Sequence, residues 1–137
     1  MLNESQERHV TATLRVTEEE LLALRRHVAG AGPRQTLFAV ENDVSADDRM
    51  RVTQKIDDAL ALIEQTKTRL SLGRVTQSLR HLLIATVTLM VVDLADTKAD
   101  GLRVYGPPDP DVWTTLDPMI DDIVTTLDAI VTLMRGA

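Results

Sequence analysis

The segment HLLIATVTLMVV, from His81 to Val92, constrains the fold of this chain more than any other feature. Its last eleven residues carry no charge, so a helix through them is apolar on nearly every side. Eleven residues fall well short of the roughly 20 that a membrane-spanning helix needs. A helix of this kind is normally buried over most of its surface. Neighbouring helices, a loop or a partner must therefore cover it.

Helical spacing extends over most of the chain. Apolar side chains recur at alternating steps of three and four residues, which is the period of an amphipathic helix. This spacing predicts helices at residues 4–29, 46–72, 74–95 and 118–135. Glycine, proline and polar residues gather in two further segments, which we predict to be loops: residues 30–44 and 96–111.

Several residues have the chemistry of helix ends. Asn3, with a glutamine three residues later, can form a capping box for the first predicted helix. Ser45 can cap the second helix, and Gly73 can end it. Asp117 followed by Pro118 suits the start of the last helix, because proline fits the first helical position.

A chain of 137 residues is long enough for one domain with a substantial core. We therefore predict an all-α fold, an up-and-down antiparallel four-helix bundle that occupies residues 1–137 as a single domain. The predicted link between the second and third helices is short, at Leu72 and Gly73. A short link favours an antiparallel hairpin of these two helices.

Residues 9–16 also allow a different interpretation, because Val10, Ala12, Leu14 and Val16 alternate with polar residues as they would in a strand. A strand here, followed by a helix that Thr17 could cap, resembles the ribbon-helix-helix family of dimeric DNA-binding proteins. The resembling stretch is VTATLRVTEEELLALRRHVAGAGPRQT.

The resemblance implies that Thr11, Thr13 and Arg15 would read bases, and that Arg34 and Thr36 would lie near phosphate. Residues 1–40 hold five basic and five acidic side chains, however, and so lack the basic surface of a DNA-binding segment. No second strand lies nearby in the sequence. We favour one continuous helix and keep a DNA-binding regulator as the alternative function.

Composition excludes several classes of function. The formal charge of −6 opposes binding to nucleic acid or to anionic membranes, and three aromatic residues are too few for base stacking. The chain has no cysteine, which excludes disulfides, thiolate metal sites and thiol catalysis. Its first residues lack the cationic and apolar pattern of a signal peptide. These features predict a soluble cytoplasmic protein.

The residues that could support catalysis or metal binding do not form a recognisable motif. His81 has no acidic residue three or four positions away, and His9 and His27 lie too far apart to share a metal ion. No Glu-x-x-His pair occurs either. A divalent-metal enzyme using Asp93, Asp96 and the aspartates of residues 117–122 is an alternative, but helix capping and solvation are the better explanation of these carboxylates. We predict a noncatalytic protein without a metal or cofactor.

The apolar third helix indicates partners. Its predicted core stripe consists of Leu79, Leu83, Val87, Met90 and Leu94. The other side is also small or apolar in its middle, which gives a candidate interface of Leu82, Ala85, Thr88, Leu89 and Val92. A loop carrying Phe38 or Tyr105, a second copy of the chain or an unidentified protein could cover it. We predict a protein–protein interaction module that forms a homodimer.

Overall fold

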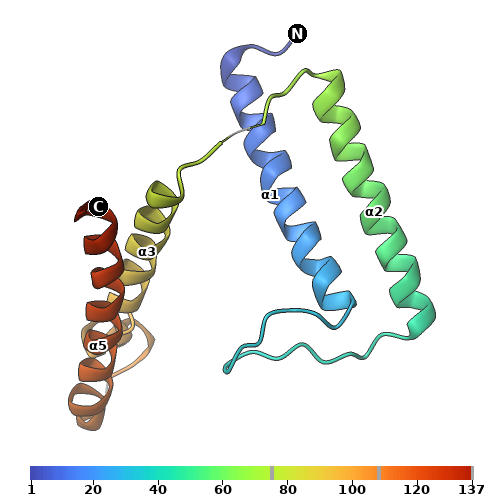
Figure 1. Ribbon diagram of the computed structural model, residues 1–137. Helices are drawn as coiled ribbons and strands as arrows, with labels where there is room; N and C mark the ends of the chain where they lie inside the picture. The colour runs from blue at the N-terminus through green and yellow to red at the C-terminus, as the bar shows by residue number, and fades with distance from the viewer. Residues whose placement is uncertain (75, 108, 137) are drawn as a thin grey trace. The chain divides into compact units, whose positions relative to one another are not determined.

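The computed structural model describes residues 1–74, 76–107 and 109–136, and all secondary structure within these ranges is helical (Figure 1). The predicted all-α class is therefore confirmed. Contacts between Cα atoms divide the chain into two compact units, Met1–Arg74 and Val75–Ala137. The arrangement of four helices in one up-and-down bundle stays a prediction.

The N-terminal unit is an antiparallel pair of long helices, α1 (Glu4–Val28) and α2 (Ala46–Arg69) (Figure 1). Both predicted N-terminal caps are confirmed. The Asn3 side chain accepts a hydrogen bond from the Gln6 backbone N–H at 2.8 Å, and the Gln6 side chain accepts one from the Asn3 N–H at 3.0 Å. Ser45 accepts a hydrogen bond from the Asp48 N–H at 3.2 Å. The sequence thus determines where each helix begins.

Both helices of this unit end in a left-handed residue. Gly30 has a φ of +74° after α1, and Ser71 has a φ of +54° after α2. The Leu72 N–H donates to the Lys67 carbonyl at 2.9 Å, which is the hydrogen bond of a Schellman motif. We expected α2 to continue to residue 72 and to stop at Gly73. It ends earlier because Ser71 takes the left-handed position and turns Leu72 inward, where it is buried.

The strand interpretation of residues 9–16 is wrong, because α1 is continuous through them. Val10, Leu14 and Leu21 are half-buried at helical spacing, which shows that a helical stripe rather than an alternating one packs in this unit. Thr13 and Arg15 are exposed on the helix. The resemblance to ribbon-helix-helix proteins therefore lacks the strand on which base reading depends.

The C-terminal unit pairs two long antiparallel helices, α3 (Leu79–Ala95) and α5 (Pro110–Gly136), which lie side by side (Figure 1). We expected α3 to begin at Arg74. Instead the Ser78 side chain accepts a hydrogen bond from the His81 N–H, so α3 begins at Leu79. The predicted hairpin of α2 and α3 stays a prediction. Val75, within the predicted helix, lies outside the described residues.

The last helix begins eight residues earlier than we predicted, at Pro110 rather than Pro118. An equivalent signal, Asp109 before Pro110, precedes the predicted one. The Asp109 carboxylate accepts a hydrogen bond from the Asp111 N–H at 3.0 Å. Pro118 is accommodated inside the helix, where the missing N–H and ring usually cost about 3 kcal/mol. Contacts elsewhere in the unit must offset this cost.

The predicted loop at 96–111 contains two short helices, α4 (Ala99–Leu102) and η1 (Arg103–Tyr105); its Pro108 lies outside the described residues. Asp117 binds this connection instead of capping the last helix. Its carboxylate accepts a hydrogen bond at 2.8 Å from the N–H of Ala99, which is fully buried. Lys98 forms an ion pair with Asp121 at 2.7 Å, and that hydrogen bond raises the pKa of the lysine. Two aspartates of α5 thus bind the connection.

Gly101 of α4 lies close to the backbone at the end of α3, so a substitution there measures how tightly this connection packs. A Cβ atom at Gly101 would collide with the backbone carbonyl of Asp96, at the end of α3. Backbone atoms cannot rotate away as a side chain can, so we expect Gly101→Ala to lower the free energy of unfolding by about 1–3 kcal/mol. Gly73→Ala is the matched control, because a Cβ there meets no atom within 4 Å. Thermal unfolding followed by circular dichroism would compare them, and equal melting temperatures would contradict this packing.

Candidate interaction surface

The buried side of α3 differs from the predicted core stripe. Val87 is buried as predicted, but Leu79 and Met90 are exposed. The half-buried positions around Val87 are Leu83, Ile84, Val91 and Leu94. Successive residues of a helix are about 100° apart around its axis. The buried side of α3 is therefore rotated around this axis from the predicted side by about half of that angle.

The opposite side of α3 carries an apolar stripe in contact with solvent. We call this set, Leu82, Ala85, Leu89 and Val92, the outer stripe. Leu82 is 43% exposed, Leu89 65% and Val92 54%. Steps of three, four and three residues align these four side chains along the helix, as in the seam of a coiled coil. Thr88, the fifth residue of the predicted interface, is exposed at the border of this stripe.

The aromatic residues that we considered as covers are themselves exposed. Tyr105 is 87% exposed at the end of η1, and Phe38 is also exposed. Within this connection, Ala99 and the half-buried Leu102 are packed, while Tyr105 extends into solvent. The connection that carries Tyr105 therefore does not cover the outer stripe.

A second exposed apolar surface is shared by α3 and α5. Leu79 and Met90 lie to one side of the buried residues of α3. Met119, Ile123 and Leu133 lie to one side of the buried residues of α5. Because the two helices are antiparallel, the positions around each helix place both sets on the same face of the pair. We call these five residues the hairpin face.

The other face of the pair is polar. Its exposed residues on α5 include Asp121, Asp128, Thr132 and Arg135. The aspartate-based metal alternative has no support on this face, because Asp117 and Asp121 already bind Ala99 and Lys98. Within the described ranges, no three histidine, aspartate or glutamate side chains are grouped so that they could hold a metal ion.

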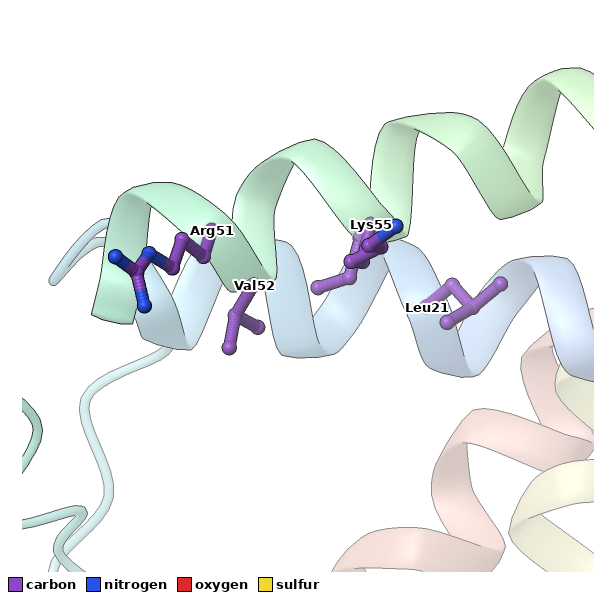
Figure 2. Close-up of a pocket in the computed structure, with 5 residues that line it drawn as sticks. Leu21, Arg51, Val52 and Lys55 are labelled. Carbon is purple, nitrogen blue, oxygen red and sulfur yellow. The ribbon is translucent and has the colours of Figure 1, made fainter. Parts of the chain in front are cut away.

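The N-terminal unit has a shallow hollow of about 320 Å³ between its two helices (Figure 2). Figure 2 shows Leu21 on α1 and Val52 on α2 at this hollow, with Arg51 and Lys55 beside them. The surface of the hollow that faces solvent is apolar. Among the residues that line it, only Arg51 and Lys55 are charged. It provides apolar contact but no group arranged for acid–base or nucleophilic chemistry.

A larger recess of about 510 Å³ lies where α1 ends and the segment before α2 folds back. His27, Arg34 and Arg49 line it together with Glu41 and Asp43, so its charges are mixed. The Nε atom of Arg49 is buried there with no hydrogen-bond partner among the described residues. Sequence patterns gave no sign of this recess, because its walls come from a segment without periodicity.

None of the described helices has the length and apolar character needed to cross a membrane. The exposed apolar surfaces of the C-terminal unit are the clearest candidate site in the described chain, and the outer stripe contains four of the five residues predicted from the sequence. No protein-family model, curated protein or solved structure matches this chain.

Proposed function

We propose that this protein is a noncatalytic helical module that acts through protein–protein contact and self-associates as a homodimer. The observation that supports the proposal is the outer stripe, an apolar seam left in solvent on the most apolar helix of the chain. Contiguous exposed apolar surface of this kind is typical of interaction sites. Its predicted contact residues are Leu82, Ala85, Thr88, Leu89 and Val92.

The energetics favour covering the stripe. Fully burying a leucine or valine side chain contributes about 1.5–3 kcal/mol, and the three large residues of the stripe are each about half exposed. In a symmetric dimer every such contribution occurs twice. Several kcal/mol are thus available before the entropy of association is subtracted.

We retain the four-helix up-and-down bundle as part of this proposal. Each helix pair buries little on its own: the buried apolar residues in the described chain are Ile56, Leu72, Val87, Ala99, Ile120 and Val131. Two-layer packing is the usual way for helix pairs to cover an apolar side. In such a bundle the hairpin face would be internal, and the outer stripe would remain available to a second copy.

Mixing isotopically distinct copies tests self-association. Unlabelled and ¹⁵N-labelled full-length chains would be combined and examined by native mass spectrometry. We expect a species of intermediate mass that contains one chain of each kind, because subunits of a reversible dimer exchange. If only single chains of the two masses are found across micromolar to millimolar concentrations, the proposed function is wrong.

A further inference from the structure

The outer stripe has a symmetry of its own. Leu82 and Val92 lie five residues on either side of Val87, and Ala85 and Leu89 lie two residues on either side. If two α3 helices pack antiparallel, the larger Leu82 lies opposite Val92 of the second copy, and Ala85 lies opposite Leu89. In a parallel pair, Ala85 would instead lie opposite another alanine and leave a gap. Alternating large and small residues favour close packing.

The charges of the C-terminal unit also distinguish the two orientations. Residues 93–122, around the turn between the long helices, hold eight carboxylates and two basic side chains, a formal charge of −6. The other end, residues 79–92 and 123–136, holds Arg80, Arg135 and one carboxylate, Asp128, a formal charge of +1. A parallel pair would place two strongly acidic ends together. An antiparallel pair places each acidic end beside a weakly basic one.

We infer that the outer stripe binds the outer stripe of a second copy, α3 against α3 and antiparallel, with the twofold axis between Ala85 and Leu89. This inference rests on the proposed function and adds the partner surface and its orientation. The stripe is only four residues long, so the contact belongs to the small class of interfaces, below about 1,200 Å² in total. We therefore expect association in the micromolar range rather than a permanent dimer.

Cysteine pairing tests the orientation, and the absence of native cysteine provides a clean background. Two full-length variants, Leu82→Cys and Val92→Cys, would be oxidised separately and as a mixture. Ten residues of helix extend roughly 15 Å, whereas the Cα atoms of a disulfide lie at most about 7 Å apart. Antiparallel packing therefore brings residue 82 close to residue 92 of the other copy. The two copies of residue 82, and the two copies of residue 92, stay too far apart to form a disulfide.

We expect a disulfide between the two variants in the combined sample. We expect no disulfide-linked dimer when either variant is oxidised alone. Thr132→Cys, on the polar face of α5, mixed with either variant serves as the control and should form no disulfide. A disulfide between two copies of the same variant, found for both variants, would show a parallel pair. That result would overturn the inference and leave the proposed function intact. A chain that exchanges subunits but forms no disulfide at either position also overturns it. Absence of exchange overturns both.

Discussion

We expect Val87→Asp to unfold the C-terminal helix pair, whereas Val92→Asp should leave its helices formed. Val87 is 6% exposed and Val92 is 54% exposed on the same helix, so one chemical change is compared in two environments. An unpaired charge left in a packed interior costs about 3–5 kcal/mol, a large fraction of the stability of a small domain.

The measurement is thermal unfolding by circular dichroism, at a concentration low enough that association does not contribute. Val87→Asp should lose helical signal at a much lower temperature than Val92→Asp. If the two variants melt together, α3 does not pack by the side that contains Val87.

The second large effect concerns association. Val92→Glu places a carboxylate at the end of the outer stripe, opposite Leu82 of the second copy, so two copies would bring two charges into the apolar contact. A cost of about 3 kcal/mol or more corresponds to a rise of the dissociation constant of about 100-fold or more. Sedimentation equilibrium would measure it.

Thr132→Glu is the matched control for this substitution. It adds the same charge to an exposed position on the polar face of α5, three residues before Arg135. We expect it to leave the dissociation constant nearly unchanged. If both variants weaken association equally, net charge rather than the outer stripe governs it.

Helix ends were predictable where a single residue type supplies the hydrogen bond. The cap at Ser45 and the capping box at Asn3 depend on side chains a few residues away, so the sequence alone determines them. The start of the last helix was not predictable in the same way. Asp-Pro occurs twice, before Pro110 and before Pro118, and local sequence does not show which aspartate is needed elsewhere.

The orientation of α3 could not be predicted for a related reason. Packing direction is read from the contrast between apolar and polar sides, and a helix apolar on nearly every side offers little contrast. The role of Asp117 depends on a residue eighteen positions away, Ala99, which meets it only when the connection folds. The apolar residues of the outer stripe could nevertheless be singled out from the sequence, because an uncharged outer side is itself unusual for a surface helix; their role as an interface stays a prediction.

Absolute mass in solution, measured by light scattering behind a sizing column over a wide range of concentrations, tests self-association most directly. One chain has a mass of 15.2 kDa. Self-association through the outer stripe predicts a mass that rises with concentration toward twice this value. A mass that stays at 15.2 kDa at every concentration would contradict it.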